Sequence, residues 1–193
     1  IGTMHDLIEI RWHGRGGQGA VTASKLLAEA ALGSGQYFQA FPDYGPERMG
    51  APIRAFTRLS PRPIRIHSAV ETPDVVVVLD PTLLATVPVT EGLKEDGTLL
   101  VNTSASPAEV RETTGLETGR VFVVDASHIA IEEIGREITN TPMLGALART
   151  TDLFDIEALS GELRAWFGKK LPPKAVEANV RAMRRAAETV QGG

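Results

Sequence analysis

The 193-residue sequence contains no cysteine. A chain without thiols forms no disulfide and offers no cysteine ligand to an iron–sulfur cluster or to a cysteine-based zinc site. It also lacks the thiolate that a cysteine-dependent enzyme uses as its nucleophile. Any iron–sulfur redox centre that works with this chain is therefore expected on another polypeptide.

Long apolar runs are missing as well. No stretch approaches the roughly 20 apolar residues that a membrane-spanning helix needs, and the N-terminus lacks the charged-then-apolar pattern of a secretory signal. We therefore expect a cytoplasmic protein without a membrane partner. Residues 1–3 precede Met4 and are expected to be a remnant of an expression tag. Residues 4–193 fit a single domain, because 42% hydrophobic content is enough for one core.

An excess of positive charge is also absent. The formal net charge is -4, and the 20 Lys and Arg residues are mixed among 24 Asp and Glu residues. Without a broad basic face the chain is not expected to bind nucleic acid, although a local basic pocket for one phosphate is compatible with this composition. The four histidines share no metal-ligand spacing, and no Gly-x-Ser-x-Gly elbow supplies a serine nucleophile. We predict no metal site and no catalytic residue on this chain.

The sequence does contain an alternation of strands and helices. Three short β-branched runs at 74–80, 97–102 and 119–125 are typical of strands buried on both faces, as in a parallel sheet covered by helices. Residues 51–67 have the alternating pattern of an antiparallel hairpin with a proline-containing turn. Together these patterns predict a Rossmann-like, three-layer α/β/α domain with a mostly parallel, mixed sheet.

Helical spacing fills most of the remaining sequence. Segments 82–93 and 106–113 are expected to be helices between strands. The C-terminal part is expected to be a helical segment, because apolar residues there recur at helical intervals after good helix starts. Its helices are predicted at 127–138, 155–167 and 174–190, opened by Ser127, Asp155 and Pro172–Pro173.

A glycine-rich stretch, Trp12–Gly19 (WHGRGGQG), lies between a predicted strand and a predicted helix at 20–32. Gly14, Gly16 and Gly19 match the G-x-G-x-x-G spacing. Glycines there allow a tight turn and a close approach of a ligand to the backbone, and the free N–H groups and dipole of the following helix attract an anion. The stretch predicts a phosphate-binding loop, and a tight turn without a ligand is the alternative.

A nicotinamide dinucleotide site would need one further residue. Such folds place an Asp or Glu at the end of the second strand, about 20 residues after the glycines, to hold the ribose hydroxyls. The predicted second strand, 36–40, is followed by Phe41 and Pro42, and Asp43 comes after that proline. A stand-alone NAD(P)-binding protein is therefore an alternative that lacks an expected residue.

A second loop, 41–52, follows that strand and carries Glu47 and Arg48 among turn-forming residues. Open α/β sheets bind ligands at the carboxyl ends of their strands, so we expect this loop beside the glycine loop. Arg48 can then pair with a phosphate that the glycine amides hold, with Arg15 as a second cation. The alternative is a Glu47–Arg48 surface ion pair of little energetic weight.

Several motifs together resemble one known family. The motifs extend in order from about Ile8 to the last predicted helix, and they are GRGGQGAVTASKLLAEAA, FPDYGPERMGAPIRAFTRLS, PDVVVVLDPTLL, NTPMLGAL and PPKAVEANVRAMRRAAE. The sequence is similar to the gamma subunit of 2-oxoacid:ferredoxin oxidoreductases, and to the pyruvate type in particular.

The resemblance implies one subunit of a larger enzyme. That enzyme converts a 2-oxoacid, coenzyme A and oxidised ferredoxin into acyl-CoA, carbon dioxide and reduced ferredoxin. Thiamine diphosphate and the 4Fe–4S clusters would be held by partner subunits, expected to be alpha, beta and delta chains, and ferredoxin is reached through the complex. Pyruvate is the favoured substrate, and a 2-oxoglutarate or branched-chain 2-oxoacid enzyme is the alternative. The chain alone is expected to be inactive.

The same resemblance implies a shared coenzyme A site with a basic pair in the loop after the second strand. Glu47–Arg48 occupies that position, so an acid replaces one cation and Arg48 is the best single cation. The glycine-rich turn would contact coenzyme A or the diphosphate edge of a neighbouring subunit, and two asparagines are further hydrogen-bond donors or else plain helix caps. The candidate cofactor-binding residues are Gly14, Arg15, Gly16, Gly17, Gln18, Gly19, Glu47, Arg48, Asn102 and Asn140.

Other polar residues at strand ends are assigned structural roles. His13 is expected to be satisfied by the backbone rather than by a phosphate. Asp80 and Asp125 are expected to cap the helices that follow them, with catalytic carboxylates as the alternative. An assembly subunit whose loops bury against a partner and touch no small molecule is a further alternative for the whole chain.

Overall fold

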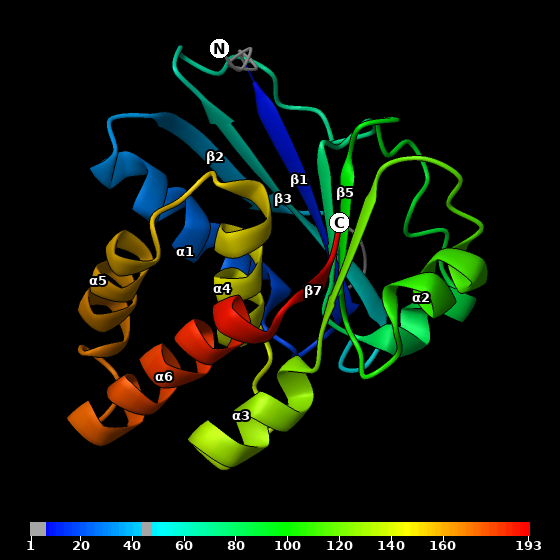
Figure 1. Cartoon of the computed structure of the whole chain (residues 1–193). Helices are drawn as coiled ribbons and strands as arrows, with labels where there is room; N and C mark the ends of the chain where they lie inside the picture. The colour runs from blue at the N-terminus through cyan, green and yellow to red at the C-terminus, as the bar shows by residue number, and fades with distance from the viewer. Residues whose placement is uncertain (1–6, 44–47) are drawn as a thin grey trace.

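The computed structural model describes residues 7–43 and 48–193 (Figure 1). Within these residues, one seven-stranded sheet has the order β2-β3-β1-β4-β5-β6-β7. The strands are β1 (Ile8–Arg15), β2 (Tyr37–Pro42), β3 (Pro52–Ser60), β4 (Val75–Val78), β5 (Thr98–Asn102), β6 (Arg120–Val124) and β7 (Gln191–Gly192).

Most strands of this sheet run in one direction. β1, β4, β5 and β6 are parallel neighbours. β3 pairs antiparallel with both β1 and β2, so β2 points the same way as β1, and β7 is antiparallel to β6. The predicted mostly parallel, mixed sheet is therefore confirmed. The carboxyl ends of β1, β2 and β4 lie at the same edge.

Helices cover the two faces of the sheet unequally. In Figure 1, α1, α4, α5 and α6 lie on one side of the sheet, and α2 lies on the other. The three-layer α/β/α arrangement with a helical C-terminal segment follows from this distribution. The helices are α1 (Ala20–Gly33), η1 (a 3-10 helix, Pro81–Ala85), α2 (Pro107–Thr114), α3 (Ala126–Ile134), α4 (Asn140–Thr151), α5 (Ile156–Phe167) and α6 (Pro173–Thr189).

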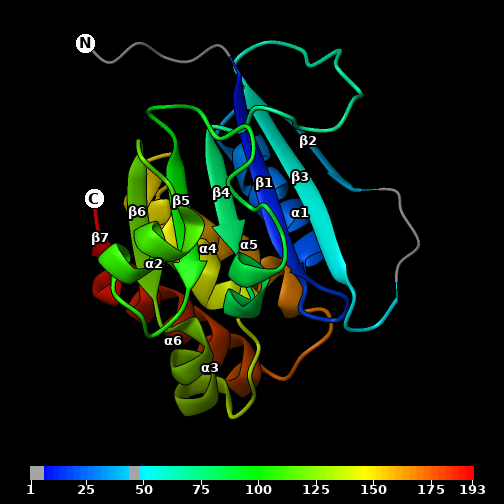
Figure 2. The ribbon, with the colours of Figure 1, turned by 90° about the vertical axis from the view of Figure 1, so that its right-hand side faces the viewer.

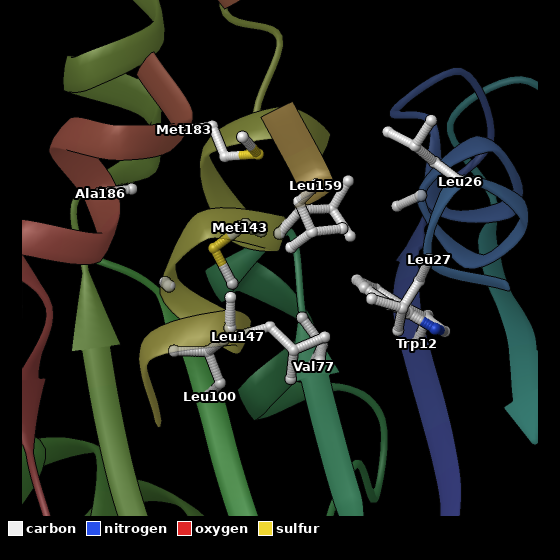
Figure 3. Packing of buried hydrophobic residues seen from close by; sticks show 14 of the residues in the cluster. Trp12, Leu26, Leu27, Val77, Leu100, Met143, Leu147, Leu159, Met183 and Ala186 are labelled. Atoms are coloured by element: carbon white, nitrogen blue, oxygen red, sulfur yellow. The ribbon is translucent and has the colours of Figure 1, made fainter. Parts of the chain in front are cut away.

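The main core lies between the sheet and the larger helical layer. Figure 3 shows Leu27 of α1 beside Trp12 of β1, and Leu147 of α4 beside Leu100 of β5. Full burial of a Leu or Met side chain contributes about 1.5–3 kcal/mol relative to exposure. A smaller cluster fills the opposite side, where Val76 of β4 packs under η1 and α2 with other residues of that cluster. Strand β4 is buried on both faces, as its continuous valine run predicts.

The part of the sheet formed by β1, β3 and β2 has loops instead of a helix on its second face. Figure 2 shows this face toward the viewer, with the described helices α2 and η1 lying over the other strands. Arg58 on β3 donates to the carbonyl of Ser68 at 2.7 Å, and Arg11 on β1 donates to the carbonyl of Val89 at 3.0 Å. Polar side chains of the strands thereby hold the loops after β3 and after η1 against the sheet.

Three predicted elements are corrected by the structure. The prediction of a second hairpin strand within 51–67 is wrong. β3 pairs with β1 and β2, and residues 61–74 form no strand. Prolines at both 61 and 63 remove backbone donors there. The helix predicted at 82–93 is reduced to η1, since Pro88 and Gly92 interrupt it.

The helix predicted at 127–138 begins and ends earlier than expected. Asp125 caps α3 by accepting from the backbone N–H of His128 at 3.0 Å, and Gly135 ends the helix with a left-handed φ of 80°. The predicted Asp155 cap is confirmed, because its carboxylate accepts from the backbone N–H groups of Glu157 and Ala158 at the start of α5. Within residues 7–43 and 48–193, no helix has the length and apolar character needed to cross a membrane.

Candidate functional site

The glycine-rich turn joins the end of β1 to the start of α1. Gly17 and Gly19 have φ values of 92° and 82°, a left-handed conformation that side-chain-bearing residues rarely adopt. No side chain caps α1, whose N-cap is Gly19. Among the described residues, the N–H groups of Gly17 and Gly19 have no hydrogen-bond acceptor. The turn therefore presents unpaired donors at the positive end of a helix dipole.

The second loop packs directly against this turn. Gly16 donates its N–H to the carbonyl of Ala51 at 2.9 Å, and Gly50 donates to the carbonyl of Gly16 at 3.2 Å. A Cβ on Gly16 would lie 2.5 Å from the carbonyl oxygen of Arg48, so only glycine fits there. The structure thus brings the backbone of Arg48 next to the glycine-rich turn, and the residue is exposed to solvent. Glu47 lies outside the described residues.

Asn140 enters the site from a distant part of the sequence. It is the first residue of α4, is 7% exposed, and its Nδ2 lies so close to Gly19 that a Cβ there would be 2.6 Å away. Its Oδ1 accepts from the backbone N–H of Thr141 at 2.9 Å. In the described chain Nδ2 has no acceptor. Asn140 is not the N-cap of α4, which is Thr139, so the plain-cap alternative does not apply to it.

Asn102 is used within the fold. It is 3% exposed at the end of β5, and its Nδ2 donates to the carbonyl of Leu79 and to Oγ of Ser127, both at 2.9 Å. Its Oδ1 accepts from the backbone N–H of Ser127 in the first turn of α3 at 3.1 Å. These bonds join β4, β5 and α3. Asn102 is not the N-cap of α2 or α3, whose N-caps are Ser106 and Asp125, but both hydrogens of its Nδ2 are used within the protein and none remains for a ligand.

Arg15 is likewise committed to protein acceptors. Its Nε lies 3.2 Å from Oδ2 of Asp80, its Nη2 donates to Oγ1 of Thr82 at 2.9 Å, and its Nη1 donates to the carbonyl of Gly50 at 3.1 Å. The guanidinium thereby links the glycine-rich turn, η1 and the second loop. The carboxylate of Asp80 balances its charge. Arg48 has no ion-pair partner among the described residues, so it is the cation of this site that is left for a ligand.

Asp80 holds the glycine-rich turn through a second side chain. Gln18 donates from Nε2 to Oδ2 of Asp80 at 2.8 Å, and its Oε1 accepts from the backbone N–H of Arg15 at 2.7 Å. Asp80 also caps η1 by accepting from the N–H of Thr82 at 3.0 Å, which confirms its predicted capping role. Burial would raise the pKa of Asp80, but hydrogen bonds from Thr82 and Gln18 and the Arg15 charge outweigh burial and lower it.

His13 lies near the end of β1 and is 3% exposed. Its Nε2 accepts from Nε of Arg11 at 3.0 Å, so the neutral ring carries its proton on Nδ1. Burial, and then the charges of Arg11 and Arg54, lower the pKa of His13 from 6.5 to about 3. The partner is a side chain and not the backbone that the sequence led us to expect. Across the part of the chain that the structure describes, no group of three or more acidic or histidine side chains could hold a metal ion.

The sequence matches the family model described as pyruvate ferredoxin/flavodoxin oxidoreductase over residues 9–189. The chain belongs to this family. Pyruvate synthase subunit PorC of Thermotoga maritima is 56% identical over 183 residues, which cover 95% of this chain and 94% of that protein. A Pyrococcus abyssi protein named pyruvate/ketoisovalerate oxidoreductases common subunit gamma is 52% identical over 185 residues, covering 96% and 98% of the two chains.

A solved structure agrees with both the fold and the family. The crystal structure of pyruvate oxidoreductase subunit PORC (EC 1.2.7.1) from Thermotoga maritima superposes with a TM-score of 0.87 at 51% identity, covering 98% of this chain and 99% of that one. The resemblance to 2-oxoacid:ferredoxin oxidoreductase gamma subunits and the α/β fold expected from the sequence are thereby confirmed.

The sequence alone missed one component of this candidate site. The link from Asp80 through Gln18 and Arg15 to the second loop was not anticipated. A signal for it exists, because Asp80 follows β4, which is the parallel neighbour of β1. Residues after two neighbouring parallel strands meet at one edge of the sheet. A polar pair between residue 80 and the turn after β1 is therefore the contact that this topology favours.

Proposed function

We propose that this chain is the gamma subunit of a pyruvate:ferredoxin oxidoreductase and supplies part of a coenzyme A site at a subunit junction. The observation that carries the proposal is a group of hydrogen-bond donors without acceptors. The amides of Gly17 and Gly19 lie in one turn, Nδ2 of Asn140 lies against Gly19, and the backbone of Arg48 packs against Gly16 in the same turn. Donors combined with one cation favour a ligand with anionic oxygens, and coenzyme A carries several phosphates.

The rest of the reaction belongs to partner chains in this proposal. Pyruvate, coenzyme A and oxidised ferredoxin give acetyl-CoA, carbon dioxide and reduced ferredoxin, and coenzyme A supplies the thiol that takes up the acyl group. The cysteine-free chain has no thiolate for an iron–sulfur cluster. Alpha, beta and delta subunits then hold thiamine diphosphate and the clusters, and they deliver electrons to ferredoxin. The residues of this chain bind and orient coenzyme A only.

A branched-chain 2-oxoacid is the second candidate substrate. The Pyrococcus abyssi relative carries the name of a common subunit for pyruvate and ketoisovalerate oxidoreductases. One gamma chain that serves both enzymes cannot itself select the 2-oxoacid. We therefore assign the choice between pyruvate and a branched-chain substrate to the other subunits.

A nicotinamide dinucleotide fits this geometry poorly. β3 lies between β1 and β2, so the end of β2 is two strand spacings of roughly 4.8 Å away from β1 instead of one. The acidic residue after β2, Asp43, pairs with Arg54 at 2.6 Å. A ribose above the glycine-rich turn would therefore lack the carboxylate that dinucleotide folds provide.

Substitutions at Arg48 and Asn140 test the proposal. In the assembled enzyme, Arg48→Ala and Asn140→Ala should each weaken coenzyme A binding about tenfold, because each removes a hydrogen bond to an anionic oxygen worth roughly 1.5–3 kcal/mol. Isothermal titration of coenzyme A and its KM with saturating pyruvate measure the effect. Arg65→Ala removes an exposed arginine from the loop after β3 and serves as the matched control.

Unchanged coenzyme A affinity and turnover in both variants would contradict the assigned site. A pure assembly subunit predicts that outcome, together with a loss of subunit association in the same variants. A thermal shift of the isolated chain with NADH but not with coenzyme A would instead support the dinucleotide alternative.

A further inference from the structure

Both carboxylate oxygens of Asp80 are occupied, and they face different segments. Oδ1 accepts from the N–H and Oγ1 of Thr82, at 3.0 and 2.6 Å, within η1. Oδ2 accepts from Nε2 of Gln18 at 2.8 Å and lies 3.2 Å from Nε of Arg15. One oxygen thus holds the residue in place at the end of β4, and the other holds the glycine-rich turn.

Two backbone hydrogen bonds tie Gly16 to the second loop, but the part of the turn from Gly17 to Gly19 has few hydrogen bonds of its own. Gly17 and Gly19, which flank Gln18, have no side chains, and the turn contains one internal backbone hydrogen bond, from Gln18 N–H to the carbonyl of Arg15 at 3.1 Å. The amide of Gln18 is held in one orientation, because Oε1 must accept from Arg15 and Nε2 must donate to Asp80. Polar side chains that are satisfied at both ends rigidify the segments they join.

We infer that Asp80 is a positioning residue for the coenzyme A site: through Gln18 and Arg15 it sets the direction of the Gly17 and Gly19 amides and anchors the second loop at Gly50. This role rests on the proposed function. Asp80 does not touch the ligand. Its carboxylate acts as an acceptor and counter-charge beneath the loop, and it thereby leaves Arg48 as the cation that meets the phosphate.

A pair of substitutions can separate this role from helix capping. Asp80→Asn keeps a good N-cap, because Asn and Asp cap helices equally well. It also replaces the acceptor Oδ2, which faces Gln18, with an NH2 donor. The NH2 groups of residues 18 and 80 then oppose each other. If the Gln18 amide rotates to avoid this, its NH2 group opposes the backbone N–H of Arg15 instead. Gln18→Glu alone places two carboxylates against each other. The double variant restores an N–H donor to a carboxylate acceptor between residues 80 and 18, keeps an acceptor for the backbone N–H of Arg15, and preserves the net charge. It does not restore the contact between Nε of Arg15 and Oδ2 of residue 80, so the rescue reports on the link through Gln18.

Steady-state kinetics of the assembled enzyme test the inference. Asp80→Asn and Gln18→Glu should each raise the KM for coenzyme A about tenfold, with the KM for pyruvate unchanged, since loss of preorganisation affects only the ligand of this loop. The double variant should lower the KM for coenzyme A again relative to both single variants, because the link between residues 18 and 80 is restored. Asp155→Asn, at the remote N-cap of α5, is the matched control and should leave both KM values unchanged.

Amide hydrogen exchange gives a second measurement on the isolated chain. Exchange in the segment from Arg15 to Ala20 should accelerate in each single variant and slow again in the double variant, while the core strand β4 stays protected. This readout also reports a variant that fails to fold.

The outcomes distinguish the inference from the function on which it rests. A double variant no better than the single variants, or single variants with an unchanged KM for coenzyme A while Arg48→Ala raises it, would overturn the role of Asp80 alone. If neither Arg48→Ala nor the Asp80 variants change the KM for coenzyme A, the proposed coenzyme A site itself fails.

Discussion

At the scale of single residues, the neutral His13 is the clearest case of a side chain controlled by its surroundings. Its imidazole accepts from Arg11 beside Arg54, in a buried place where a second positive charge is unfavourable. The pKa of His13 is about 3 in the folded protein against 6.5 as its ordinary value. Between pH 6.5 and about pH 3 the unfolded chain binds a proton at His13 that the folded chain does not, so the free energy of unfolding falls as the pH falls.

We expect this histidine to dominate a defined part of the pH dependence. Its contribution is fully present above pH 6.5 and is lost at up to about 1.4 kcal/mol per pH unit on acidification. Between pH 6.5 and 5 the wild-type chain should lose about 2 kcal/mol of unfolding free energy from this source. His13→Asn should flatten that dependence. Urea unfolding at several pH values measures it.

The control for this prediction is a histidine elsewhere. His128→Asn removes an imidazole whose side chain is 61% exposed on α3. If His13→Asn and wild type lose equal stability over this pH range, the buried neutral state of His13 is refuted.

At the scale of elements, the sequence predicts those that local patterns control. The β-branched runs became β4, β5 and β6, and Asp155 and the two prolines at 172 and 173 start α5 and α6 as expected. The meeting of the glycine-rich turn with the second loop also follows, because both come after strands with the same direction.

Elements that depend on distant pairing could not be predicted in this way. β3 alternates like a hairpin arm, yet its partners are β1 and β2, and nothing local distinguishes these choices. Asn140 is adjacent to Gly19 only because α4 packs beside α1 on the sheet, so its sequence position carries no sign of the contact. The commitment of Arg15 to Asp80 is likewise a consequence of the order of β1 and β4.

The contact between α4 and α6 gives a prediction at this scale. A Cβ on Gly145 of α4 would lie 1.8 Å from the backbone oxygen of Met183 on α6, so the two helices approach as closely as a glycine permits. Gly145→Ala must push the helices apart and should destabilise the chain by about 1–3 kcal/mol or more. Thermal unfolding measures the loss.

Gly161 on α5 provides the matched substitution. A Cβ there meets no atom within 4 Å. Gly161→Ala should therefore stabilise the chain by roughly 0.5–1 kcal/mol through better helix propensity. Equal effects of the two substitutions would contradict the close helix contact. Because α4 begins at Asn140, Gly145→Ala in the assembled enzyme should also raise the KM for coenzyme A.

At the scale of the whole molecule, the chain has a complete core but an incomplete site. Two apolar clusters fill the space on either side of the sheet. The donors beside Gly19 and Arg48 lie at the carboxyl edge, where partner subunits complete the pocket in our proposal. Folding and ligand binding should therefore separate when the chain is isolated.

The isolated chain should unfold cooperatively, contain no iron, and show no pyruvate-dependent reduction of ferredoxin. Its affinity for coenzyme A should be at least about tenfold weaker than that of the assembled enzyme, because the donors of this chain satisfy only part of the ligand. Parallel titrations of the chain and the complex measure the ratio, and adding the other subunits should restore both affinity and turnover. Equal affinities would mean that this chain holds the whole site, and the junction would then have no part in binding coenzyme A.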